Sequence, residues 1–295
     1  MDMKKKSHRA AFALLVVLMM PMAAFAVVHG VDVGGISVTD PLVNEGSVSV
    51  EGWQWDAGTK TLTLNSRYNL APSSSGHIYI ACDPTDTVRL VYSGGIKIDG
   101  KGGYEAISCV GNLEITGTLG MLTLYSVNRG AIASQSGTLS IGGDAKITAI
   151  SGAISGGSAG EIIGAALDVT IKDNASITAI STASGYGGIH SGSGSVNINT
   201  AGDVTVDVDA SENLKNALFA GNEIDIQKGT VNITVNNPDD AFNNKPKIKG
   251  DAKVYVNGNR YNSGGGGGGG CNFGGSAYIL IAFAGLLTLK IRRIA

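Results

Sequence analysis

Short strands recur in groups of three through the middle of the chain, and this repeat limits the fold more than any other feature. Each strand is about two to five residues long with β-branched residues at alternating positions, and glycine, serine, asparagine or aspartate separates one strand from the next. The segments DAKITAI at 144–150 and NASITAI at 174–180 are the closest copies. No stretch shows the 3.6-residue apolar period of a helix over a helical length.

The number of residues between equivalent strands varies, although the strands still occur in groups of three. Ile80 and Ile107 are 27 residues apart, and Ile107 and Ile132 are 25 apart. A later step, from Ile189 to Leu218, is 29 residues. Variable steps with constant groups are typical of a solenoid, because insertions go into the turns while stacked strands keep their register.

We therefore predict an all-β, single-domain parallel β-helix of about seven coils, with three short parallel sheets around a core one side chain wide. A β-sandwich is the alternative, but it favours hairpin turns and gives no reason for a group of three strands. Glycine makes up 44 of 295 residues without the three-residue period of collagen, and 43% hydrophobic residues are enough for a core. The net charge of −2 argues against a nucleic-acid partner, which would need a basic face.

Residues 45–65 differ from the coils that follow. They contain both tryptophans, Trp53 and Trp55, and a turn at 56–60. The segment predicts a hairpin that caps the open end of the first coil, as terminal units of solenoids do. Its string GWxWDxxTKTLTLN, followed by coils of the form AI, LxI and xITA, resembles the β-helical carbohydrate-binding domain proteins of bacterial cell surfaces over about residues 45–260. The resemblance implies a right-handed β-helix on the cell surface that binds polysaccharide, in some members acidic polysaccharide with calcium.

Residues 1–26 have the pattern of a signal peptide. Four basic residues between positions 4 and 9 precede the apolar stretch 10–20, and Ala24-Phe25-Ala26 provides the small-x-small motif that a signal peptidase reads. We expect cleavage after Ala26, which leaves a mature β-helix domain at 27–262.

The chain ends in a pattern typical of a membrane stop with a processing site. Residues 263–270 are a glycine linker, and 271–295 contain Cys271, an apolar run at 277–289 and a basic end. The run reaches across a ~30 Å hydrocarbon core only if 273–276 join the transmembrane helix, and the basic end should stay cytoplasmic. This order resembles the bacterial C-terminal sorting domains of the Synergist-CTERM type over about a tenth of the chain. It implies a C-terminal sorting enzyme that processes at Cys271; a plain membrane anchor is the alternative.

Period-two alternation places polar side chains in outward rows on the predicted sheets. Hydroxyl, amide and carboxylate groups repeated at the ~4.8 Å rung spacing suit a repeating polymer such as a polysaccharide, and they equally suit a β-face that is merely soluble. One predicted row is Thr123, Thr148, Thr178, Thr205 and Asn232, and another is Glu114, Ser140, Thr170, Asn197 and Asp225; the candidate binding residues are Thr148, Thr178, Thr205, Asn232 and Asp225.

Paired carboxylates on neighbouring coils would indicate an enzyme that cleaves polysaccharide by acid and base catalysis. Asp203, Asp207 and Asp209 are expected to point outward, so a polysaccharide lyase or hydrolase is the alternative function. The coil register places Ile180 and Thr234 beside Asp207, so no carboxylate faces it across the ladder. We therefore expect no catalytic residues.

Asp207, Asp209 and Glu212 are candidate calcium ligands in a loose oxygen site, because calcium binds carboxylate oxygens. An EF-hand is excluded, since Glu212 and Leu218 stand where that loop requires glycine and glutamate. A solvated turn without metal is the alternative, and no other cofactor is expected. His190 is expected to point outward from a strand with no fixed acid partner.

Cys82 and Cys109 follow Ile80 and Ile107 by two residues each, so they are predicted to stack on consecutive coils. Adjacent strands place Cα atoms within the range that a disulfide tolerates. Directly stacked side chains point the same way, however, which strains the preferred ~90° dihedral. A disulfide and two buried free thiols therefore both remain open.

Together these features predict an exported, surface-displayed, non-catalytic β-helix that binds glycan or serves as an adhesive or structural element of the envelope. It would be tethered to the membrane through its C-terminal region, with signal peptidase and the sorting enzyme as processing partners.

We expect Cys271→Ala to leave a longer, unprocessed membrane species, because sorting enzymes of this type read the cysteine together with the glycine tract and the helix. Mass spectrometry of the mature C-terminus checks this. Recovery of intact Ile294 and Ala295 on the wild-type protein from cells would contradict processing at Cys271.

Overall fold

The computed structural model describes residues 30–33, 36–39, 48–50, 52–65, 77–100, 105–127, 129–152, 160–181, 187–208 and 216–262. The predicted signal peptide, glycine linker and sorting segment lie outside these residues. Across the part that is described, the only helical element is the short 3₁₀ helix η1 (Pro238–Ala241).

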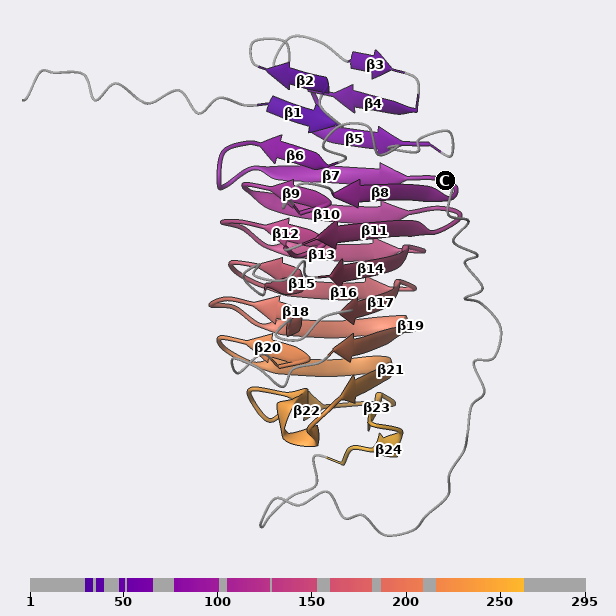
Figure 1. Cartoon of the computed structure of the whole chain (residues 1–295), viewed down its shortest axis with the longest axis vertical. Helices are drawn as coiled ribbons and strands as arrows, with labels where there is room; N and C mark the ends of the chain where they lie inside the picture. The colour runs from indigo at the N-terminus through magenta and orange to yellow at the C-terminus, as the bar shows by residue number, and fades with distance from the viewer. Residues whose placement is uncertain are drawn as a thin grey trace, which may run out of the picture. The chain divides into compact units, whose positions relative to one another are not determined.

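The described residues form a parallel β-solenoid of about 6 turns, in which each turn contributes strands to three faces (Figure 1). Face A contains β6 (Ile78–Ala81), β9 (Ile107–Cys109), β12 (Ile132–Ser134), β15 (Glu161–Ala165), β18 (Gly187–Ser191) and β20 (Leu218–Ala220).

Faces B and C are joined by two long strands, β19 (Val196–Val208) and β21 (Ile224–Val235), which run through the corner between them. Face B contains β5 (Thr61–Leu64), β7 (Thr87–Tyr92), β10 (Asn112–Gly117), β13 (Leu139–Gly143), β16 (Val169–Asp173), the first halves of β19 and β21, and β22 (Lys247–Ile248). Face C contains β8 (Ile96–Gly100), β11 (Leu122–Val127), β14 (Lys146–Gly152), β17 (Ser176–Ser181), the second halves of β19 and β21, and β23 (Lys253–Val256).

Two details of the predicted fold need correction. Three separate sheets were expected, but β19 and β21 merge faces B and C into one hydrogen-bonded sheet, with a register shift near Asn199. About seven coils were expected, whereas the structure has about 6 turns. The segment after the last full turn does not complete a seventh coil, because on face A it forms only a single bridge, between Leu218 and Phe242.

The hairpin predicted near the two tryptophans is present. β3 (Val48–Val50), β4 (Trp53–Asp56) and β5 pair antiparallel in sequence, and β5 then pairs parallel with β7. Trp53 and Trp55 are buried. A second antiparallel pair, β1 (Gly30–Val33) and β2 (Ile36–Thr39), was not anticipated; it extends face A through β1 and β6. At the other end, β23 and β24 (Asn259–Arg260) form an antiparallel hairpin.

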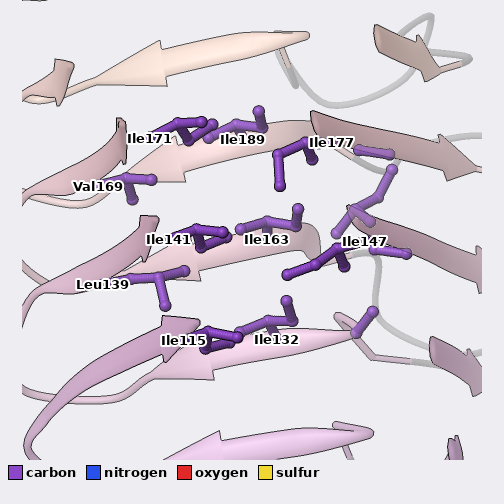
Figure 2. Packing of buried hydrophobic residues seen from close by; sticks show 14 of the residues in the cluster. Ile115, Ile132, Leu139, Ile141, Ile147, Ile163, Val169, Ile171, Ile177 and Ile189 are labelled. Atoms are coloured by element: carbon purple, nitrogen blue, oxygen red, sulfur yellow. The ribbon is translucent and has the colours of Figure 1, made fainter. Parts of the chain in front are cut away.

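Stacked aliphatic side chains fill the interior. Figure 2 shows Ile115, Ile141 and Ile171 one above another on successive strands of face B, all of them fully buried. Ile132 and Ile163 stack in the same way on face A. Each such side chain contributes about 1.5–3 kcal/mol when it leaves water. The order of inward residues therefore fixes which outward residues are neighbours.

Tyr92 links coils that are not adjacent. Its buried hydroxyl donates to the carbonyl oxygen of Lys146 (2.9 Å) and accepts from the Lys146 N–H (2.6 Å). Gly117 lies between them, and a Cβ added there would be 2.5 Å from the tyrosine ring. Burial raises the pKa of Tyr92 to about 12, so the phenol stays neutral and keeps its proton for the bond.

We expect Tyr92→Phe to lower the free energy of unfolding by about 1–3 kcal/mol, because it leaves the Lys146 N–H and C=O without this buried partner. Urea denaturation followed by far-UV circular dichroism measures the change. Tyr255→Phe is the matched control, since Tyr255 lies on the outward side of β23 and should be near neutral. Equal destabilisation by both variants would contradict this role for Tyr92.

Candidate functional site

One polar row runs along face C, and its order is the one that the sequence predicted. We call Thr123, Thr148, Thr178 and Thr205 the threonine row; they occupy the same position on β11, β14, β17 and β19. All four are half-buried, as expected of outward side chains on a packed sheet. The register continues from Lys97 on β8, through the threonine row, to Asn232 on β21 and Tyr255 on β23.

An apolar row lies two residues further along the same strands. It consists of Tyr125, Ile150 and Ile180, which are in register and half-buried. The amino group of Lys97 lies 4.7 Å from the centre of the Tyr125 ring, a cation–π contact. The middle of face C therefore presents hydroxyl groups beside aliphatic and aromatic groups, with no charge among the threonine and apolar rows.

Carboxylates occur toward both ends of face C: Asp99 on β8 is in register with Tyr125, and Asp203 and Asp207 lie on β19. Val204, Val206 and Val208 are buried, so Asp203 and Asp207 are exposed as predicted. Asp207 is in register with Ile180 on one side and Thr234 on the other. The expected lack of a carboxylate partner across the ladder is therefore found, while Asp209 lies outside the described residues.

The structure describes only one of the three residues of the candidate calcium site. Asp207 is exposed, whereas Asp209 and Glu212 lie outside the described residues. Within the described ranges, no group of three or more histidine, cysteine, aspartate or glutamate side chains is placed to hold a metal. Calcium binding at this turn stays a prediction.

The second predicted row lies on face B. Glu114, Ser140, Thr170, Asn197 and Asp225 are in register in that order, continued by Arg89 before them and Lys247 after them. The charged members are paired: Arg89 Nε lies 3.1 Å from Glu114 Oε2, and Lys247 pairs with Glu223. These charged side chains in the end coils of face B are therefore paired with other side chains of the protein.

Asp225 is in the predicted position but does not have the expected exposure. It is only 5% exposed, because Lys249 and Gln227 cover it. Its Oδ2 accepts hydrogen bonds from Lys249 (2.9 Å) and Gln227 (2.8 Å), while its Oδ1 has no partner among the described residues. Burial raises the pKa of Asp225, but the hydrogen bonds to Lys249 and Gln227 outweigh it and lower the pKa below its ordinary value.

Face A holds a histidine–carboxylate contact that sequence reasoning missed. His190 points outward as expected, but its Nδ1 lies 2.7 Å from Glu161 Oε1, so it does have an acid partner. The imidazole also packs edge-on against Phe219, with ring centres 4.3 Å apart. Only an alignment of β15 with β18 could have found the pair, because Glu161 lies in register with Gly187 and reaches His190 diagonally.

Cys82 and Cys109 lie together, although not through the predicted register. Ile107 pairs with Ile78 rather than Ile80, and Cys109 lies opposite Ile80. The expected stacking of Cys82 on Cys109 is therefore wrong by two residues. The thiols meet diagonally across the turn, with their sulfur atoms 3.7 Å apart and no disulfide between them.

The predicted processing positions, Ala26 and Cys271, lie outside the described residues. No helix in the described part of the chain has the length and apolar character to cross a membrane.

Comparison with known proteins adds no relative: no protein-family model, no curated protein and no solved structure matches this chain. The function is therefore argued from the geometry of the faces.

We expect Asp225→Asn to lower the free energy of unfolding at pH 7 by ~1–3 kcal/mol, because the neutral amide removes the charge that pairs with the Lys249 ammonium. The folded-state pKa of Asp225 is depressed, so its stabilisation is present above about pH 4 and is lost as the pH falls through the folded pKa. Urea unfolding midpoints from pH 7 to pH 3 measure the gap, which should close with acid.

Glu114→Gln provides the control for Asp225→Asn. The Arg89–Glu114 pair is exposed, and such pairs contribute only about 0–1 kcal/mol. A gap for Asp225→Asn that does not narrow at low pH would contradict the role given to the charge.

Proposed function

We propose that the protein is an exported, non-catalytic β-solenoid that binds polysaccharide along face C at the cell surface. The observation that carries the proposal is the unbroken register of the threonine row beside the apolar row on successive coils. These two rows give a surface that repeats along the solenoid axis, as a polymer does.

The chemistry of the two rows matches the two sides of a sugar ring. A threonine hydroxyl both donates and accepts hydrogen bonds, as a sugar hydroxyl does. Tyr125, Ile150 and Ile180 provide apolar groups against which the C–H face of a sugar can pack, and the tyrosine ring adds an aromatic platform. Rungs at ~4.8 Å repeat these contacts along the solenoid axis.

Acidic polysaccharide with calcium is the ligand class that we favour. Lys97 at the N-terminal end of the face offers a positive charge beside the carboxylate of Asp99, while the exposed Asp203 and Asp207 lie near its C-terminal end. Carboxylates of the protein and of the polymer can share a calcium ion, which prefers such oxygen ligands. The resemblance of 45–260 to surface carbohydrate-binding β-helices supports the same ligand class.

A lyase or hydrolase is the competing function, with Asp203, Asp207 and Asp209 as its acids and bases. Acid and base catalysis of glycoside cleavage needs two carboxyl groups ~5–9 Å apart around the bond. The in-register neighbours of Asp207 are an isoleucine and a threonine, which argues against the lyase or hydrolase function.

The location is part of the proposal. Export through a signal peptide cleaved after Ala26, and tethering through the tail at Cys271 and the apolar run, would place face C in the envelope, where polysaccharides occur. Both features are supported by sequence pattern alone.

The test is binding of polygalacturonate, with and without calcium, to Thr148→Val/Thr178→Val. Valine keeps the shape of threonine and removes its hydroxyl, so the fold should be retained while two hydrogen-bonding positions are lost. We expect affinity to fall by about fivefold to 100-fold, as two hydrogen bonds of ~0.5–1.5 kcal/mol each would give. Affinity electrophoresis measures the change.

The matched control is Ser140→Ala/Thr170→Val, which alters face B on the same coils and should leave binding unchanged. Release of unsaturated products or new reducing ends from the polymer would establish the enzyme instead. No retention of polygalacturonate or of other envelope polysaccharides by the wild-type protein would contradict glycan binding and leave a structural role.

A further inference from the structure

The only two cysteines among the described residues lie in contact in the interior. The Sγ atoms of Cys82 and Cys109 are 3.7 Å apart, and both residues are buried. A disulfide bond is ~2.05 Å long, so the sulfurs need to approach by less than 2 Å. The pair connects the turn after β6 with the end of β9, on consecutive coils.

The surroundings favour reaction at Cys82. Its sulfur accepts a hydrogen bond from the Gly111 N–H at 3.2 Å, and the Cys109 thiol can donate a second. These bonds lower the pKa of Cys82, whereas contact with Cys82 and burial raise the pKa of Cys109. A thiolate is the attacking species in disulfide exchange. Because the Gly111 N–H is held at its sulfur and would stabilise a thiolate there, Cys82 is the thiol prepared to attack first, and Cys109 the thiol that resolves.

Glycine at position 111 leaves space for this arrangement. A Cβ there would lie 3.0 Å from the Cys82 sulfur and within 2.7 Å of the carbonyl oxygens of Asp83 and Asp86. The two cysteines are not directly stacked, since Cys109 lies opposite Ile80 and not opposite Cys82. The strain argument that applied to direct stacking therefore does not apply to this diagonal contact.

We propose that Cys82 and Cys109 are the site of an inter-coil disulfide, formed by exchange with a disulfide oxidant of the cell envelope, either an oxidoreductase or a small disulfide. The proposal uses the exported location given under the proposed function, but it is independent of polysaccharide binding. The bond would fasten the first coil to the second, next to the tryptophan hairpin that ends the solenoid.

The exchange balances in two steps. The Cys82 thiolate attacks one sulfur of the oxidant's disulfide, which breaks that bond and releases one oxidant thiolate. The Cys109 thiol then loses its proton and attacks the Cys82 sulfur, which releases the second oxidant thiolate. Two electrons and two protons pass from the cysteine pair to the oxidant, and the chain loses two hydrogen atoms.

The test uses the full-length chain with Cys271→Ser, so that Cys82 and Cys109 are its remaining cysteines. The reduced protein is unfolded in urea and refolded in a buffer of oxidised and reduced glutathione, so that burial does not limit access. We expect no titratable thiol under denaturing conditions, a mass lower by two hydrogens, and a peptide that joins the two cysteines. Circular dichroism confirms refolding.

Cys82→Ser and Cys109→Ser in the same background are the matched controls; each should keep one thiol or take up one glutathione. The oxidised parent should melt on the order of 5–10 °C above its reduced form, as closure of a loop of this length predicts, and neither control should show this redox dependence. Two free thiols, or two glutathione adducts, on correctly refolded parent would overturn the proposal. Polysaccharide binding is measured separately, so failure of one proposal leaves the other standing.

Discussion

The stacking of inward aliphatic side chains is the constraint on which the rest of the structure depends. A coil of three short strands cannot bury its apolar face alone, so it gains stability only by placing its isoleucines, leucines and valines on those of the next coil. Ile115, Ile141 and Ile171 illustrate this on face B. Because side chains alternate in and out along a strand, the same stacking fixes every outward row. The threonine row is therefore a consequence of core register.

How much of the structure could be predicted from the sequence follows from this dependence of the outward rows on the register of the core. The sequence was sufficient for the solenoid class, the tryptophan hairpin and the order of the threonine row, because the DAKITAI and NASITAI copies set Thr148 beside Thr178 without ambiguity. It was insufficient at the first coil, where Ile78 and Ile80 both fit the inward pattern and the structure selects Ile78 as the partner of Ile107. Alternating apolar residues show which side of a strand points into the core. They do not show which of two equivalent residues pairs with a given residue of the next strand.

Other features could not be read from the repeat because they depend on how far long side chains reach. Glu161 contacts His190 diagonally, Lys249 covers Asp225, and the Tyr92 hydroxyl passes over Gly117 to the backbone of Lys146. Each contact joins residues at different positions in their coils. An alignment of equivalent positions on successive coils therefore cannot predict these contacts. The burial of Asp225 has the same origin: its row position is outward, and only the neighbouring lysine and glutamine remove it from water.

The distribution of charge separates face C from face B as binding surfaces. On face B, Glu114 and Asp225 are committed to Arg89 and Lys249, so an approaching polymer would have to break existing pairs. The threonine and apolar rows of face C have no ion pairs to break, and contacts made there depend little on ionic strength. Beside these rows, face C carries charge at Lys97 and Asp99 on β8, at the exposed Lys146 on β14 and at Asp207 on β19, and these groups would respond to salt or calcium. A polymer bound along face C would then be held by neutral contacts along the threonine and apolar rows and aligned by ionic contacts beside them.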